Sequence, residues 1–108
     1  MSDYENYRDF ILKKIDERTL LEQLAKEASE LSQATLKLIR ARGLSKNVTP
    51  KTEESVTQNF VDEMIDCSIV MTLLCLKDKK IKTAVLNSGY VEESPKWKRW
   101  AERLGYKG

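Results

Sequence analysis

Two pairs of acidic residues, Glu27 with Glu30 and Glu63 with Asp66, have the spacing in this sequence that most suggests chemistry. The two members of each pair are three positions apart, so on an α-helix both carboxylates project to the same side. At about 100° per residue, Glu27 falls inside an apolar arc and Glu30 lies at its edge. The arc consists of Leu20, Leu21, Leu24, Ala28, Leu31, Ala34 and Leu38.

The second pair has a similar setting. Glu63 projects between Val70 and Leu74 on a helical projection, and Asp66 comes close to Val70 and Leu73. Burying unpaired carboxylates is costly, so four of them aimed at an interior need a compensating charge. A divalent metal ion is the simplest source of that charge.

The donor set narrows the choice of metal. Four carboxylates without a histidine or thiolate suit a hard cation, so we expect Mg²⁺, with Mn²⁺ as a substitute. The chain contains no histidine, which excludes Glu-x-x-His di-iron sites, histidine-ligated zinc sites and histidine-based nucleophile triads. It also lacks a glycine-rich phosphate loop, so nucleotide binding of the Rossmann or Walker kind has no support.

Composition favours a helical protein. Glycine and proline are scarce, at four and two residues in 108, and this argues against a turn-rich β fold. The net charge of +2 gives no indication of a nucleic-acid polymer as partner. We therefore expect one all-α domain over residues 1–108, with about five helices and a central helical bundle completed by oligomerisation.

The cysteines and the N-terminus indicate a cytoplasmic protein. Cys67 and Cys75 would lie about 12 Å apart along one helix, beyond the roughly 7 Å that a disulfide tolerates. They are expected to be buried free thiols in a reducing compartment. Residues 1–10 have no apolar segment typical of a signal peptide. The longest apolar run, residues 67–76, is about half of a membrane span, so no membrane partner is expected.

Capping signals divide the chain into five expected helices. Thr19 and Glu22 fit a capping box, Gly43 fits a helix end, and Ser94 is expected to be an N-cap. Thr49 followed by Pro50 predicts the start of the third helix. The expected helices cover about residues 4–16, 20–42, 50–76, 79–87 and 95–104.

The third expected helix is apolar on almost all sides from residue 64 to residue 76. A helix without a solvated face is buried in the domain or at a subunit contact, and in so small a domain we expect a homodimer or homotetramer. Phe10 and Phe60 are expected to be core residues.

The two acidic pairs resemble the signature of the MazG-like all-α nucleoside triphosphate pyrophosphohydrolases, which are related to dimeric dUTPases and dCTP pyrophosphatases. That signature is E-x-x-E on one helix and E-x-x-D on a later one, and here it lies within QLAKEASELSQA and VDEMIDCSIVMTLL. The resemblance covers residues 20–76 well and the ends loosely. The stretch between the pairs, residues 31–62, is longer than is usual in the family.

The resemblance implies a hydrolase that cleaves a nucleoside triphosphate, in particular a dNTP, to the monophosphate and pyrophosphate. Glu27, Glu30, Glu63 and Asp66 would ligate magnesium ions that bridge the phosphates. One of the glutamates would orient or deprotonate the attacking water, and the sequence leaves open which one.

Contacts to the substrate are also suggested by the resemblance, because family members hold phosphates with basic residues late in the chain. Lys96 and Arg99 are the first candidates, and Lys82 and Asn87 are further ones. Gln23, one turn before Glu27, is a candidate contact to base or sugar. The alternative for the last helix is a plain amphipathic helix, with an apolar stripe of Trp97, Trp100, Ala101 and Leu104.

A different class of function also fits the sequence. The protein would then be a non-catalytic helical interaction module, with residues 67–76 as its partner surface. The acidic pairs would then be ordinary solvated carboxylates, which contribute well under about 1 kcal/mol each.

Overall fold

The computed structural model describes residues 2–43 and 53–108, and these residues are predominantly helical. The expectation of an all-α fold is confirmed, because no strand occurs in these two ranges. A short 3-10 turn, η1 (Val91–Glu93), precedes the last helix. The helices are α1 (Asp3–Lys14), α2 (Glu17–Ala41), α3 (Glu53–Lys77), α4 (Lys79–Asn87) and α5 (Pro95–Arg103).

The start of α2 differs from the expected capping box. Asp16, not Thr19, is the N-cap, and its Oδ1 accepts a 2.8 Å hydrogen bond from the backbone N–H of Thr19. The helix therefore begins at Glu17, one turn earlier than expected, because an aspartate carboxylate in this position already satisfies an N-terminal amide. The expected cap at Thr49 and Pro50 lies outside the described residues. Ser94 does cap α5, as expected, by accepting a hydrogen bond from the backbone N–H of Lys96.

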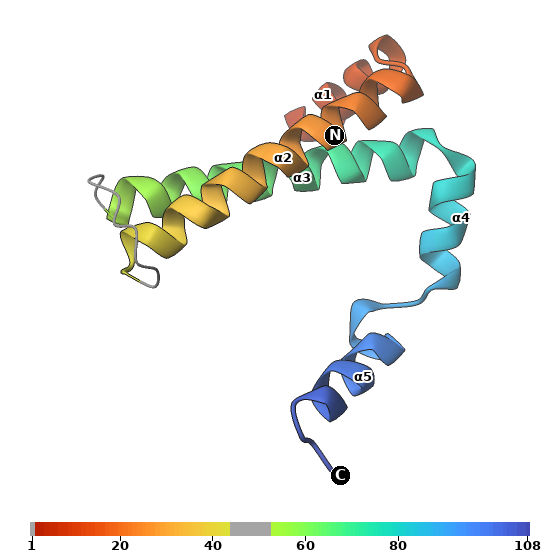
Figure 1. Cartoon of the computed structure of the whole chain (residues 1–108). Coiled ribbons are helices and arrows are strands. Elements are labelled where there is room, and N and C mark those ends of the chain that lie inside the picture. The colour runs from red at the N-terminus through yellow and green to blue at the C-terminus, as the bar shows by residue number, and fades with distance from the viewer. Residues whose placement is uncertain (1, 44–52) are drawn as a thin grey trace.

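The centre of the fold is the pair formed by α2 and α3, two 25-residue helices that lie side by side and run antiparallel (Figure 1). The buried residues of α2, Leu20, Glu27 and Ala34, recur every seven positions, and those of α3 from Cys67 to Leu74 recur at three and four, which places each set on one side of its helix. Leu20 of α2 packs with Val70, Leu73 and Leu74 of α3. Partly buried residues from α1, α2, α4 and the α1–α2 junction surround this cluster: Ile11, Leu12, Ile15, Leu24 and Ile81.

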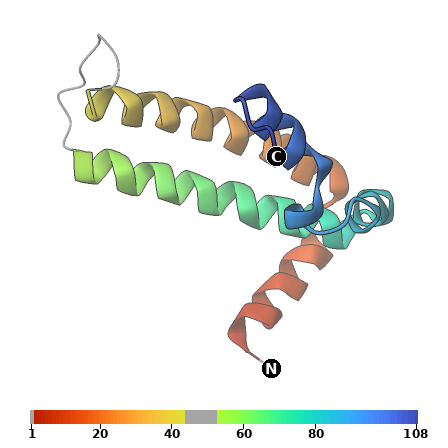
Figure 2. The same cartoon turned by 90° about the horizontal axis from the view of Figure 1, so that it is seen from below.

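The remaining helices diverge from this pair. Figure 1 shows α1 and α5 on opposite sides of it, while α4 turns away from the end of α3, and Figure 2 shows α1 extending away from the pair on the α3 side. Phe10, expected in the core, is 62% exposed, because only the C-terminal part of α1 reaches the central cluster. Among the described helices, none is both long enough and apolar enough to cross a membrane.

The central segment of α3 is buried on one side only within a single chain. Cys67, Val70 and Leu74 are buried, whereas Met64 and Met71 are each 47% exposed. Large apolar side chains are also exposed on α1 and α5. In a single chain, large apolar side chains of α1, α3 and α5 are therefore exposed to solvent.

Candidate metal centre

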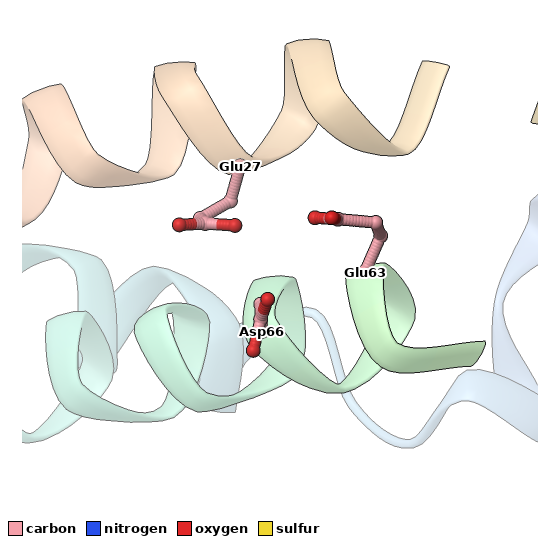
Figure 3. A group of neighbouring side chains, drawn as sticks. All are labelled: Glu27, Glu63 and Asp66. Carbon is pink, nitrogen blue, oxygen red and sulfur yellow. The ribbon is translucent and has the colours of Figure 1, made fainter. Parts of the chain in front are cut away.

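Three of the four predicted carboxylates meet between α2 and α3. Figure 3 shows Glu27 of α2 and Glu63 of α3 reaching into the space between the helices from opposite sides, with Asp66 on α3 beside them. One carboxylate oxygen from each residue lies within 4.8 Å of the other two. Glu27 and Glu63 are 36 positions apart in the sequence. They converge because α2 and α3 run antiparallel and the two acidic pairs lie at the same level along the helix pair.

Burial falls off across this group. Glu27 is buried, with only 7% of its surface exposed, whereas Glu63 is half-buried and Asp66 is exposed. The gradient leaves the Asp66 edge of the group accessible from solvent and its Glu27 edge enclosed. A ligand that enters from solvent would meet Asp66 first.

Two buried oxygens in this group lack hydrogen-bond donors. Oε1 of Glu27 accepts a 2.7 Å hydrogen bond from Nε2 of Gln23. Oε2 of Glu27 and Oε2 of Glu63 are buried and have no hydrogen-bond partner among the described residues. Within residues 2–43 and 53–108, no lysine or arginine forms an ion pair with the predicted carboxylates. Buried carboxylate oxygens normally have such partners, so the group fits a cation.

The electrostatic surroundings of Glu63 also fit a cation at this group. The pKa of Glu63 is raised, first by desolvation and then by the negative charges of Glu30, Asp66 and Glu27. A hydrogen bond with Glu30 raises that pKa further. Glu30 is half-buried and borders Glu63, since its charge acts on the pKa of Glu63, but it lies outside the group of three that share the 4.8 Å separation. A divalent cation would offset the negative charges that raise the pKa of Glu63.

Cys67 lies next to this group. It is buried one turn after Glu63, and the pKa of its thiol is raised by burial and by the surrounding carboxylates. The thiol is therefore protonated and is a poor nucleophile. Cys67 and Cys75 are both free, as expected, although Cys75 is only half-buried. The position of Cys67 at i+4 from Glu63 was a signal that it would face the acidic site.

The predicted substrate contacts are distributed differently. Gln23 is at the site, where it binds the carboxylate of Glu27. Lys82 and Asn87 are on α4, which begins beyond the end of α3, about 17 Å along the helix from Asp66. Lys96 and Arg99 are on α5, which Figure 1 shows well apart from α2 and α3. A single chain thus brings Gln23 to the carboxylates but not the four residues of α4 and α5.

The donor set suits Mg²⁺, because carboxylate oxygens are its preferred protein ligands and it keeps several water molecules or substrate phosphates in its remaining positions. Three converging carboxylates with an edge open to solvent provide such a partial set of ligands. No family model matches this chain, and no curated protein or solved structure matches it either.

Proposed function

We propose that this chain is a magnesium-dependent nucleoside triphosphate pyrophosphohydrolase that converts a nucleoside triphosphate, in particular a dNTP, to its monophosphate and pyrophosphate. The observation that carries the proposal is the convergence of Glu27, Glu63 and Asp66 from two helices, with two buried carboxylate oxygens that lack donors among the described residues. The sequence supports it, because these residues are three of the four that resemble the MazG-like signature.

The proposed roles follow from the surroundings of each residue. Glu27, Glu63 and Asp66 hold Mg²⁺ or Mn²⁺, with Glu30 at the margin beside Glu63. When bound, the cation would neutralise charge on the triphosphate and would lower the pKa of a water molecule that it holds. Gln23 holds one oxygen of Glu27, so Oε2 of Glu27 is the atom available to a ligand.

One of the glutamates would orient or deprotonate the attacking water. Glu30 is a candidate because it lies next to the ligands without belonging to the converging group of three. Positioning and electrostatics would account for most of the rate, since this reaction needs no covalent nucleophile.

We propose further that the active form is a cytoplasmic homo-oligomer, a dimer or a tetramer. Met64 and Met71 are one heptad apart on α3 and half exposed, which is typical of a helix that packs on another helix. Association would also explain how the phosphate contacts proposed for Lys96, Arg99, Lys82 and Asn87 reach a triphosphate, because a second copy could supply them.

The test is pyrophosphate release from a panel of dNTPs and NTPs, with Mg²⁺, with Mn²⁺ and with EDTA. We expect release that requires the metal and that is abolished in Glu63→Gln. Glu54→Gln is the matched control, since it makes the same substitution at an exposed position of α3. A folded wild-type protein that releases pyrophosphate from no nucleotide with either metal would refute the proposal.

The second candidate function is the non-catalytic interaction module. It is favoured by the exposure of Ile69, Met71 and Leu76, at 51%, 47% and 45%, within its expected partner surface. Under this alternative no nucleotide is cleaved, and Glu63→Gln leaves association unchanged. The loss of a specific metal-dependent turnover in Glu63→Gln, but not in Glu54→Gln, would rule this alternative out.

A further inference from the structure

An apolar groove between α1 and α3 is left open by the residues that the structure describes. It is an open cavity of about 360 Å³, at the lower end of the volume range of ligand pockets. Its walls include half-exposed residues, such as Tyr7 at 67% and Ile69 at 51%. Apolar residues from both helices line it: Tyr4, Tyr7, Ile11, Ile65, Ile69 and Leu73.

α5 and its C-cap Leu104 carry an apolar stripe that stays exposed in the described part of the chain. Trp97, Trp100 and Leu104 follow helical spacing, and they are 58%, 62% and 79% exposed. None of the residues of α5 is buried. The helix is nevertheless ordered locally, because Ser94 caps it and the indole Nε1 of Trp97 donates a 2.6 Å hydrogen bond to the carbonyl oxygen of Val91. Such a preformed amphipathic helix is suited to docking in an apolar groove.

The charge of α5 is strongly basic. Four basic residues and one acidic residue lie within its nine positions, and Lys98 is the one that approaches Glu102, at 3.9 Å. The basic residues are Lys96, Lys98, Arg99 and Arg103.

The Tyr4 end of the groove carries the opposite charge. α1 begins with Asp3 and Glu5, and its basic residues Lys13 and Lys14 come only after Ile11, at the other end of the groove. On α3, Asp62 precedes the groove residue Ile65 by one helical turn. The one cation that lines the groove is Arg8, and its charge is already paired with Asp9 at 3.0 Å. The groove therefore complements α5 in polarity, and its Tyr4 end complements α5 in charge.

The groove and α5 of the same chain lie apart. Figure 1 places α1 and α5 on opposite sides of the α2–α3 pair. We propose that α5 of a second copy of this chain docks in the α1–α3 groove, with Trp97, Trp100 and Leu104 against the groove and the basic residues facing its acidic Tyr4 end. This contact does not depend on the proposed catalysis, and a protein that cleaves no nucleotide would still form it.

Intrinsic fluorescence gives a direct readout, because the chain has two tryptophans and both lie on α5. We expect the emission of the full chain to shift to shorter wavelength as its concentration rises, in step with the increase in mass measured by light scattering. If the copies associate through α3 alone, the mass rises while the emission stays that of exposed tryptophan. That result would overturn the proposal, as would an emission that is independent of concentration.

Ser68→Arg tests the groove without altering a tryptophan. Ser68 lines the groove and is exposed, so the substitution adds bulk and positive charge against a basic helix without disturbing the core. We expect the concentration needed for the emission shift to rise about tenfold or more. Ser32→Arg, at an exposed position of α2, is the matched control. Thr72→Arg is a second groove variant, to be used if circular dichroism shows that Ser68→Arg is unfolded.

Mixing two variants distinguishes docking between copies from docking within one. Trp100→Glu disables α5 but leaves its groove intact, while Ser68→Arg has an intact α5. When the two variants are mixed, α5 of the Ser68→Arg chain can dock in the intact groove of the Trp100→Glu chain. The emission of Trp97 and Trp100 on the Ser68→Arg chain should then shift to shorter wavelength again. Failure of the mixture to restore it, or wild-type behaviour of both folded groove variants, would overturn the proposal.

Discussion

The side-chain amide of Gln23 donates a 2.7 Å hydrogen bond from Nε2 to Oε1 of Glu27, one turn farther along α2. Glu27 is the buried member of the acidic group, and its Oε2 has no partner among the described residues. The amide therefore fixes the carboxylate in one orientation and leaves a single oxygen for a ligand. Outer groups of this kind commonly set the affinity of a metal site.

Gln23→Ala should therefore weaken Mg²⁺ binding. Removing the amide frees the Glu27 carboxylate to rotate and leaves a second buried oxygen without a donor, so we expect the Mg²⁺ affinity to fall by about 10–100-fold. Isothermal titration with Mg²⁺ measures this directly. Gln33→Ala, at an exposed position of the same helix, is the control. Equal Mg²⁺ affinity of wild type and Gln23→Ala would show that the amide does not support a metal ligand.

Neutralising Glu63 should stabilise the metal-free protein. Desolvation and the charges of Glu30, Asp66 and Glu27 all disfavour its ionised form. Glu63→Gln removes one of these charges and preserves the shape of the side chain, so we expect the thermal midpoint in EDTA to rise by a few degrees. Added Mg²⁺ should raise the midpoint of wild type but not that of Glu63→Gln, because binding stabilises only a protein that has the site. A lower midpoint for Glu63→Gln in EDTA would contradict this account of the repulsion.

The pH dependence of stability has a defined sign for Glu63. Its folded-state pKa is raised above the ordinary value of 4.5, so between the two values the folded chain binds more protons than the unfolded chain. The free energy of unfolding then falls as pH rises. This contribution is fully present below pH 4.5 and is lost as the pH passes through the raised pKa.

The measurement is the thermal midpoint in EDTA between about pH 4 and pH 8, a range in which buried acids change stability. We expect the difference between Glu63→Gln and wild type to grow in favour of the variant as pH rises. Glu17 needs its own control, because a hydrogen bond with Asp78 raises the pKa of Glu17 and adds a slope of the same sign. If Glu17→Gln removes the whole slope, Glu63 is not its source.

Much of the fold follows from local signals in the sequence. The bounds of α4 agree with the sequence expectation, and both Gly43 and the Ser94 cap mark helix ends as expected. The start of α2 was misplaced because Asp16 and Thr19 are competing cap residues, and the carboxylate of Asp16 takes the amide of Thr19. Choosing between two adequate caps depends on how the chain enters the helix, which is set by the packing of α1.

The candidate site shows the same division between local and tertiary information. Spacing alone predicted that Glu27 and Glu63 would project to one side of their helices, and the antiparallel packing of α2 and α3 brings them together. The difference in burial between Glu27 and Asp66 depends on the way the helices cross, so periodicity does not encode it. The sequence also does not predict where α5 lies relative to the other helices, because none of the residues of α5 is buried in the described structure.

Leu20 and Leu21 are adjacent members of the expected apolar arc, but the structure separates their roles. Leu20 is 2% exposed and packs with Val70, Leu73 and Leu74, whereas Leu21 is 45% exposed. Leu20→Ala should leave a cavity where α1 meets the central pair and should reduce the free energy of unfolding by about 2–5 kcal/mol.

Leu21→Ala makes the same chemical change one position away, and we expect a much smaller loss because little of its buried area is removed. Urea denaturation followed by circular dichroism compares the two variants, and it must be run at equal protein concentration because association shifts apparent stability. Should Leu21→Ala prove as costly as Leu20→Ala, the exposed half of the arc must also be buried in solution. The most direct reason would be that it lies in a contact between copies, and its cost should then disappear as the protein is diluted below the concentration at which copies associate.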